Sequence, residues 1–486
     1  MTGDSLARRT MGTGSLWIFA VGASSPLTVL VGGIPQTYAL TSVNGVPLSF
    51  VVIATVLGML TVGYVGMAKH VVHPAPFYAL LGRGLRPSFG VAGAAIALVG
   101  YNAIQISLYG LVGTTLAGLL GGGWQVWAAG IWLTVAGVGL LGGASSARVL
   151  GSFLAIELGV IICFIVAAFT HPAGRSVQLA NLAPSHLLVT GVSGVLAFSM
   201  AAMVGVEIPP AFGEEARPRH DGRAMGAAVA FLGGFYLFAA LSYSVWAGPA
   251  QVVAAARDPG RQPFALLGQV FGPSVILLAT TLLVTSVFVS MSAFHGAVAR
   301  YVFALARERL LPQRMARVSR VGHVARGGAP LGGSLVQSAV AAVVLGAFML
   351  ERADPMTVMF TWLSTIGALA VLVLLVLASL SSRAFFVRGG GRHESVWVRQ
   401  VAPVLGSVLG TLLIAMMLAN LSSLLGTRPG APALWLVPGL IAGAGLAGLS
   451  WGVLLHHTRP ATWRGIGYGT PDPLTVVDDR LSMLQV

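Results

Sequence analysis

The sequence predicts an all-α integral membrane protein with twelve transmembrane helices. Of its 486 residues, 56% are hydrophobic and only 9% are charged. Apolar runs of about 20 residues recur along the chain, which is the length a helix needs to cross the ~30 Å hydrocarbon layer of a bilayer. No polar linker is long enough to separate globular units. We therefore expect a single domain embedded in the lipid bilayer.

The expected spans follow these apolar runs in order. They cover residues 14–40, 46–68, 88–120, 124–141, 149–169, a sixth within 193–223, 224–246, 271–305, 331–349, 355–380, 401–425 and 432–455. Between the second and third spans, residues 73–87 are apolar enough for a short interfacial helix. The last ~25 residues are expected to form a short solvated tail.

The charge distribution predicts how these spans are oriented. A net charge of +14 would suggest nucleic-acid binding in a soluble protein. Here only five of the 28 basic residues fall on expected outer segments: Arg175, Arg257, Arg261, Arg352 and Arg428. The others lie at inner loops and helix ends, as the positive-inside rule predicts. We therefore expect a multi-pass protein of the cell (cytoplasmic) membrane with both termini cytoplasmic, and no nucleic-acid partner.

The sixth span contains a break. Its apolar run is interrupted at Gly205, carries a carboxylate at Glu207 and restarts at Pro209–Pro210. Proline suits the first turn of a helix, where its missing amide would be unpaired anyway. Residues 205–208 therefore read as a gap between two half-helices. Unwound backbone inside a membrane is tolerated only where protein or a water-filled cavity satisfies it, so the gap is a candidate binding site.

The first span contains a similar break. Gly22 to Pro26 repeats the Gly-x-x-x-Pro form of Gly205 to Pro209. Paired interruptions in corresponding helices of two halves are typical of the central site of a transporter. The alternative is that the glycine and serines only allow close helix packing.

Half-helix ends predict which ligand groups would bind. The amides of Leu27, Thr28 and Val29 begin a half-helix and favour a carboxylate. Carbonyl groups just before each break favour an ammonium group. A zwitterionic amino acid satisfies both ends. The expected substrate-binding residues are Gly22, Ala23, Ser24, Ser25, Leu27, Thr28, Asn102, Gln105, Ala201, Ala202, Met203, Val204, Gly205, Phe288 and Trp362.

These residues have different expected roles. Residues 201–204 would form a small apolar side-chain pocket. Asn102 and Gln105 would add polar contacts, unless they bond between helices instead. Tyr101, Gln105 and Tyr109 recur every four residues, so this polar stripe should face protein or a cavity. Phe288 and Trp362 are candidate gates, with ordinary packing as the alternative.

Two carboxylates inside the spans are candidates for proton coupling. Among 14 acidic residues, only Glu157 and Glu207 fall at membrane depth, where a carboxylate is costly unless it is paired or protonated. Glu207 has an alternative role as a structural acceptor for amides freed at the break. Glu157 has the alternatives of a neutral, hydrogen-bonded group or a partner of Arg148 or Arg300.

No pattern in the sequence predicts catalysis, a metal or a cofactor. Cys163 is the only cysteine, so it forms no internal disulfide or cysteine cluster. Zinc, phosphate-loop and dinucleotide motifs are absent, and no nucleophilic triad has a readable spacing. His295 is expected to be a hydrogen-bonded helix contact. We expect a protein that is not an enzyme.

Three motifs resemble those of the amino acid-polyamine-organocation permeases. Gly205-Val206-Glu207 resembles the glycine–hydrophobic–glutamate motif of the family's sixth helix, and residues 213–218 resemble the acidic–basic–proline tail that follows it. Residues 300–312 resemble the Arg-x-x-Tyr-Ala-type string that closes the eighth helix. The three occur in the family's order.

This resemblance implies a LeuT-like fold, with two inverted repeats of five helices and discontinuous helices 1 and 6. The implied organisation is an N-terminal tail (1–13), a core (14–382) with repeats 14–170 and 187–382, a basic loop (383–399), helices eleven and twelve within 400–456, and a C-terminal tail (457–486). Several proton-coupled members use a lysine in the fifth helix. Here Glu157 stands at about that position, and the only lysine is Lys69.

The resemblance also implies a function. The expected activity is secondary active transport of amino acids or related small amino compounds by alternating access, coupled to protons, with no cofactor. One alternative is an exchanger without net proton coupling. Another is a nontransporting membrane sensor on the same fold.

Overall fold

The computed structural model describes residues 10–140, 143–318 and 329–469. Within these residues, ten helices are long and apolar enough to cross a membrane, and two shorter apolar helices, Trp124–Val138 and Val192–Ala202, stand at the expected fourth and sixth spans. The protein is therefore an all-α membrane protein. An isolated β-bridge joins Met11 and Ala216.

The described helices are, in chain order, α1 (Thr13–Ala23), α2 (Pro26–Thr28), η1 (Val29–Gly33), α3 (Ile34–Thr41), α4 (Val46–Ala68), α5 (Pro76–Gly84), α6 (Pro87–Leu120), α7 (Trp124–Val138), α8 (Gly143–Thr170), η2 (Ala173–Arg175), η3 (Ala180–Leu182), α9 (Pro184–Leu187), α10 (Val192–Ala202), η4 (Pro209–Phe212), α11 (His220–Ala247), α12 (Val252–Ala256), η5 (Pro259–Arg261), α13 (Pro263–Phe271), α14 (Ser274–Arg307), η6 (Gln313–Ala316), α15 (Leu331–Leu350), η7 (Pro355–Phe360), α16 (Thr361–Val387), η8 (Trp397–Val401), α17 (Ala402–Ala419), α18 (Leu421–Leu425), α19 (Ala433–Thr458) and α20 (Pro460–Arg464).

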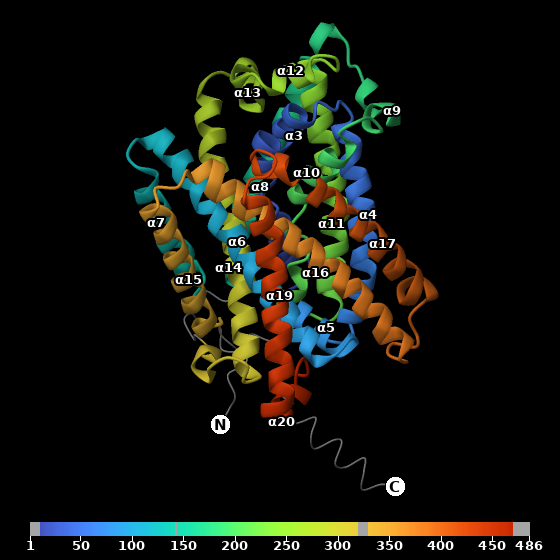
Figure 1. The fold of residues 1–486 in the computed structure, drawn as a ribbon. Helices are drawn as coiled ribbons and strands as arrows, with labels where there is room; N and C mark the ends of the chain where they lie inside the picture. The colour runs from blue at the N-terminus through green and yellow to red at the C-terminus, as the bar shows by residue number, and fades with distance from the viewer. Residues whose placement is uncertain (1–9, 141–142, 319–328, 470–486) are drawn as a thin grey trace.

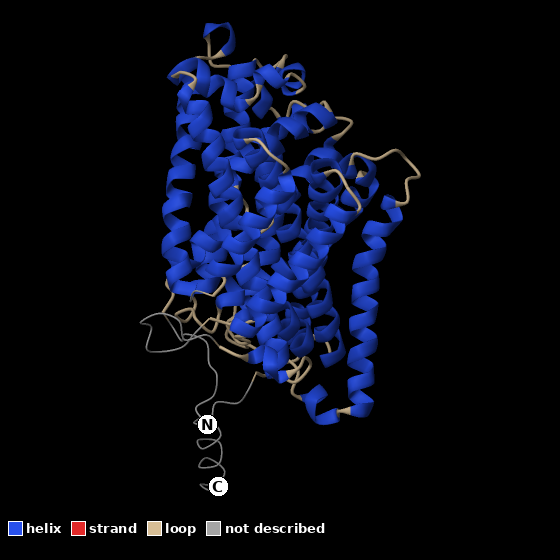
Figure 2. Cartoon of the chain, turned by 90° about the vertical axis from the view of Figure 1, so that its left-hand side faces the viewer, coloured by secondary structure: helices blue, strands red, loops and turns tan. Residues whose placement is uncertain are grey.

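The long helices run roughly side by side between two differently built ends (Figure 1). The described chain starts and finishes at one end, which also carries α5 and α20. The short helices α9, α12 and α13 cover the opposite end (Figures 1 and 2). We call these the terminal end and the far end.

The central helices approach closely because small residues face each other. A Cβ atom added to Gly100 of α6 would lie 2.8 Å from the Cβ atom of Ala370 on α16. Gly367 of α16 in turn meets Ile104 of α6. Such small residues let helices pack tightly where the surrounding lipid supplies no hydrophobic drive for association.

The short helix expected within residues 73–87 is present as α5, and its Phe77 and Tyr78 are fully buried. Two other local expectations need correction. The second half of the broken sixth span is the four-residue 3-10 helix η4, not a long helix. The sequence at residues 362–367, with Trp362, Ser364, Thr365 and Gly367, predicts an interruption of the tenth span, but α16 is continuous there. The irregular part of this span is η7, a π-helical turn, and η1 in the first span is also a π-helical turn.

Candidate functional site

The first span breaks at two consecutive serines. Helix α1 ends at Ala23, and the next helical turn begins at Pro26. Between them, Ser25 has φ +50°, in the left-handed region that is strained for a residue with a Cβ atom. Such strain persists only where the surrounding structure holds it, and it is common at functional sites. The predicted break is therefore present, and it centres on Ser24 and Ser25.

The sixth span breaks at the expected glycine. Helix α10 ends at Ala202, and Gly205 has φ +114°. A Cβ atom at Gly205 would lie 2.6 Å from the Cβ atom of Ala23 and 2.9 Å from its carbonyl carbon. Glycine is therefore required here both for the backbone conformation and for the close approach of the first break.

Hydrogen bonds tie the two breaks together. The Ser24 hydroxyl donates to the carbonyl oxygen of Ala202 at 2.8 Å and also contacts the Tyr236 hydroxyl of α11. The Ser290 hydroxyl of α14 donates to the carbonyl oxygen of Ala23 at 2.6 Å. The two breaks, about 180 residues apart in sequence, thus form one unit in the middle of the bundle.

A cavity of about 450 Å³ lies against this unit. This volume is in the range of small-molecule sites. Its lining residues are Ala23, Ser24, Ser25, Thr28, Val29, Val31, Gly32, Gly33, Gln36, Ile104, Ser107, Leu108, Leu111, Phe198, Ala201, Ala202, Val204, Leu283, Ser290, Phe294, Met356, Phe360, Thr361, Ser364, Thr365, Ala368 and Leu424. All of them are uncharged, so within the described structure a ligand meets hydroxyl, amide, carbonyl and apolar groups.

Seven of the expected substrate-binding residues line this cavity. They are Ala23, Ser24, Ser25, Thr28, Ala201, Ala202 and Val204. Gly22, Met203 and Gly205 belong to the adjoining backbone of the two breaks but do not line it. The structure places the other expected residues elsewhere.

Two of the expected amide donors already have partners. The Leu27 amide donates to Glu157 at 2.6 Å, and the Val29 amide donates to the Ser25 carbonyl oxygen at 3.2 Å. Pro26 has no amide hydrogen. The amide of Thr28 is therefore the donor from this helix start that stays a candidate for a substrate carboxylate.

The remaining expected side chains make other contacts. Asn102 donates to the Leu98 carbonyl oxygen of its own helix. Gln105 lies in a buried network with Tyr109, His295 and Gln337, in which Gln337 donates to Gln105 at 2.5 Å. Phe288 packs edge-on against Phe153, with ring centroids 6.4 Å apart. Trp362 is half-buried next to the cavity-lining Thr361.

The cavity lies on a different face of α6 from the polar stripe. The polar stripe of Tyr101, Gln105 and Tyr109 is buried against protein. The cavity is lined instead by Ile104, Ser107, Leu108 and Leu111. These four positions follow the i, i+3, i+4, i+7 pattern of one helix face. This spacing is visible in the sequence and could have predicted that they share a face.

Glu157 caps the start of the second half of the first span. Its Oε1 atom accepts from the Leu27 amide and from the Ser286 hydroxyl, each at 2.6 Å. Its Oε2 atom has no partner among the described residues. The alternative of an ion pair with Arg300 is wrong, because Arg300 binds Glu215.

Glu207 is held within the second break. It is fully buried, and its Oε2 atom accepts from the Gly205 amide at 2.8 Å. The Oε1 atom has no partner within the described chain. Glu207 therefore does act as an acceptor for a freed backbone amide, while one of its oxygen atoms stays available.

Charged and aromatic groups close the structure between the breaks and the terminal end. Phe19 of α1 stacks on Phe212 of η4, with centroids 4.3 Å apart. The Arg300 guanidinium lies 3.7 Å from the Phe212 ring centroid and donates to Glu215 at 2.6 Å. Both partners of this ion pair are almost fully buried. These contacts hold α1, η4 and α14 together on the terminal-end side of the breaks.

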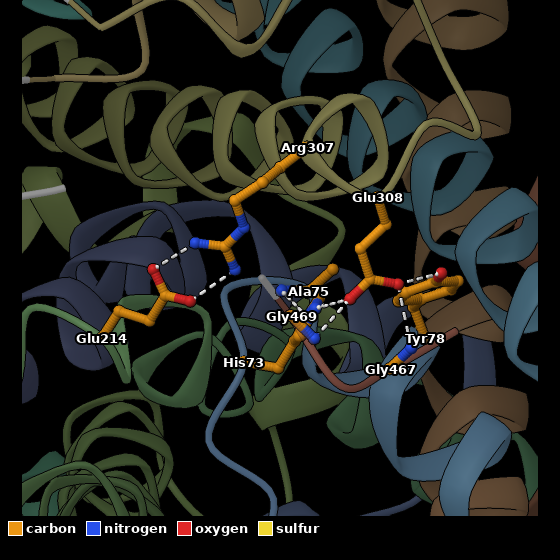
Figure 3. Close-up of polar contacts among 8 residues, drawn as sticks. All are labelled: His73, Ala75, Tyr78, Glu214, Arg307, Glu308, Gly467 and Gly469. Carbon is orange, nitrogen blue, oxygen red and sulfur yellow. Dashed lines mark hydrogen bonds and ion pairs between the residues drawn. The ribbon is translucent and has the colours of Figure 1, made fainter. Parts of the chain in front are cut away.

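Arg307 and Glu308 form a second layer of contacts closer to the terminal end (Figure 3). Arg307 donates to both carboxylate oxygens of Glu214, at 2.9 and 2.5 Å. Glu308 accepts from His73 at 2.9 Å and from the Tyr78 hydroxyl at 2.5 Å. His73 takes the tautomer with a proton on Nε2, because its Nδ1 atom accepts from the Ala75 amide.

The backbone of the C-terminal segment also binds Glu308. The amides of Gly467 and Gly469 donate to its two oxygens at 2.9 and 2.7 Å. Burial raises the pKa of Glu308, but the hydrogen bonds from His73, Tyr78 and Gly467 outweigh it and lower the pKa below its usual range. The carboxylate is therefore ionised at neutral pH.

Comparison with known proteins agrees with this architecture. Residues 12–443 match the family described as Amino acid permease. A search of curated proteins found no match. The match covers both breaks, the cavity and all the long helices except the last turns of α19. The chain therefore belongs to the amino acid permease family, within the amino acid-polyamine-organocation superfamily, and is a multi-pass membrane transporter rather than an enzyme.

Proposed function

We propose that this permease is a secondary active transporter that moves amino acids or related small amino compounds by alternating access, coupled to protons. The observation that carries the proposal is a central uncharged cavity at the contact between two broken helices, with buried and partly buried ion pairs on the terminal-end side of the breaks. A site of this kind, located where two helix breaks meet, is typical of transporters that rock around a fixed binding site.

The proposed arrangement has twelve spans, with α7 and the broken α10–η4 segment as the fourth and sixth. Spans one to five and six to ten (residues 14–170 and 187–382) form the two inverted repeats. Arg217, Arg307 and Arg388, at or beyond the ends of α10, α14 and α16, lie at the terminal end, so the positive-inside rule makes this end cytoplasmic. The described conformation is then closed to the cytoplasm, with its cavity in the outer half.

The proposed substrate pose uses the backbone at both breaks. The carbonyl groups of Ala23 and Ala202 would accept from the ammonium group, since each oxygen has a second lone pair beyond its serine partner. The Thr28 amide and the hydroxyls of Ser25 and Thr28 would bind the carboxylate. Apolar side chains such as Phe198 and Val204 would contact a small or apolar substrate side chain.

A binding screen tests the substrate class. Purified protein is heated with each member of a panel of amino acids and their decarboxylated amines. A ligand that binds the native state raises the melting temperature. Amino acids with small apolar side chains should give the largest rise, and no response to any amino acid or amine would contradict the proposal.

The proposed proton carriers are Glu157 and Glu207, each with one carboxylate oxygen atom that has no partner among the residues the structure describes. In proteoliposomes, Glu207→Gln should lose accumulation driven by a pH gradient while keeping exchange of labelled for unlabelled substrate. Glu157→Gln tests the second carboxylate in the same way. Unchanged pH-driven uptake in either variant would remove that carboxylate from the mechanism.

Two alternatives remain separable from this proposal. An exchanger without net proton coupling would show counterflow in wild-type protein but no response to a pH gradient. A nontransporting sensor would bind substrate and show neither activity. The same proteoliposome experiment distinguishes the three.

A further inference from the structure

Three hydroxyl groups connect the cavity with the buried carboxylate of Glu157. Thr28 and Ser25 line the cavity, and their hydroxyl oxygens are 2.7 Å apart. The Ser25 hydroxyl is 2.7 Å from that of Ser286 on α14. The Ser286 hydroxyl donates to Glu157 at 2.6 Å. The hydrogen-bonded path is continuous, and each oxygen–oxygen distance along it is that of a normal hydrogen bond.

We propose that Thr28, Ser25 and Ser286 form a proton relay between the cavity and Glu157, an inference that rests on the proposed role of Glu157 as a proton carrier. Each hydroxyl has one donor and can also accept. When a hydronium ion in the cavity gives a proton to the Thr28 oxygen and becomes water, each hydroxyl passes its own proton onward and keeps the one that it receives, and the Glu157 carboxylate takes up the last proton. The hydroxyls end neutral, and reversing the order releases the proton.

Two further observations favour a relay over chance packing. Ser25 bridges the other two hydroxyls from a left-handed backbone conformation that costs free energy. Glu157 itself does not line the cavity, so it needs a path to water. The other titratable side chain facing this region from α11 is Tyr236, which contacts Ser24 and not the relay. In the described chain no ion pair reaches Glu157.

Infrared spectroscopy tests the relay without requiring a known substrate. The carbonyl stretch of a protonated buried carboxyl shifts when its proton is exchanged for deuterium, and its loss in Glu157→Gln assigns the band. Ser286→Ala should slow deuterium exchange of this band on the order of tenfold, since it removes the link between Ser25 and Glu157. Thr28→Val should slow it by a smaller factor, because Ser25 also lines the cavity. Thr28→Ser keeps the hydroxyl and should restore the rate.

Ser292→Ala is the matched control, because the Ser292 hydroxyl lies on the same helix and donates only to its own Phe288 carbonyl oxygen. Its exchange rate should equal that of the wild type. Equal rates in Thr28→Val, Ser286→Ala and wild type would refute the relay but leave Glu157 as the carrier. A band unaffected by Glu157→Gln would instead refute the role of Glu157 in the proposed function.

A second inference comes from the C-terminal segment, independently of the relay. Residues 463–469 are packed against the terminal end by contacts along their whole length. The Trp463 indole donates to the Ser88 hydroxyl at 3.1 Å, and Ile466 is fully buried. Tyr468 lies under the Arg83 guanidinium, which is 3.7 Å from its ring centroid. We call residues 463–469 the strap.

The strap is linked to the closing contacts through two consecutive residues. Glu308 holds the strap through two backbone amides, and the neighbouring Arg307 holds Glu214, just beyond the second break (Figure 3). We infer that the strap stabilises the conformation closed at the terminal end. Releasing it removes two donors from Glu308 and loosens the end of α14 that carries Arg307.

Cysteine labelling tests this inference directly. Cys163 is the only cysteine, so Cys163→Ala gives a background without thiols. Ala211→Cys then places a thiol on η4, at a position that is 2% exposed in the closed conformation. Ending the chain after Arg464, or introducing Glu308→Gln, should speed labelling by a hydrophilic thiol reagent about tenfold or more, because the closed state loses charge-assisted hydrogen bonds.

Tyr468→Ala is a milder variant that leaves the chain at full length, and it should speed labelling by a smaller factor. Glu351→Gln removes an exposed carboxylate next to α15 and serves as the control, with unchanged labelling. Equal labelling rates in the wild type, the shortened chain and Glu308→Gln, with unchanged melting temperatures, would refute the role of the strap.

Discussion

The cavity region and the terminal end differ in the chemistry that holds them. Around the cavity, uncharged side chains and hydroxyls meet, and no ion pair is found among its lining residues. Toward the terminal end, Arg300, Arg307 and Glu308 each bind a partner on another segment. Ion pairs and charge-assisted hydrogen bonds can separate and be hydrated by water. Exposing packed apolar side chains to water, in contrast, costs free energy. This difference favours opening of the bundle at the terminal end.

The buried pair Arg300–Glu215 should have the largest effect when broken. Arg300→Ala leaves the Glu215 carboxylate buried without its partner, which costs about 3–5 kcal/mol. The melting temperature in detergent should fall sharply. Replacing both partners, as in Arg300→Met with Glu215→Leu, should recover most of the loss. A double variant less stable than Arg300→Ala would contradict this account.

Gly205→Ala tests the contact between the breaks. The new Cβ atom meets the backbone of Ala23, and φ +114° is strained for alanine. The backbone strain alone costs about 1–3 kcal/mol, and substrate exchange should fall with stability. Gly234→Ala on α11 is the control, since a Cβ atom there has no atom within 4 Å. Equal melting temperatures for the two variants would show that the breaks are looser than described.

Acidification should weaken the terminal end through Glu308. Because the pKa of Glu308 is lowered in the folded protein, its contribution to stability is fully present above its ordinary value of 4.5 and is lost as the pH falls through the lowered value. Melting temperatures measured from pH 7 to well below pH 4.5 should therefore fall more steeply below pH 4.5 in the wild type than in Glu308→Gln. Parallel curves would show that Glu308 does not contribute.

Arg307→Ala should have the smallest effect on stability. The pair with Glu214 is partly exposed, and such pairs contribute less than about 1 kcal/mol. Its loss should nevertheless favour opening of the terminal end, seen as faster labelling of the Ala211→Cys thiol. A large fall in melting temperature without faster labelling would assign Arg307 a purely structural role.

The sequence predicted the spans and the location of both breaks because hydrophobic length and Gly/Pro placement are local signals. The breaks at Gly205 and Pro26 could be predicted from the local sequence, without knowledge of the residues that contact them in space. The partners of Glu157 could not be predicted, since Leu27 and Ser286 are 130 and 129 residues away. The face of α6 that lines the cavity was also missed, because polarity pointed to Gln105, whose side chain binds another helix.

The two π-helical turns described above, Val29–Gly33 and Pro355–Phe360, both contribute walls to the cavity. A π turn holds one residue more than the α-helical turn it replaces, so reverting to α-helix would rotate the following segment by roughly the 100° that one residue spans. We expect both walls to be able to swivel in this way as the transporter cycles. Amide hydrogen exchange that is no faster at these turns than in the adjoining helices would rule out such a movement.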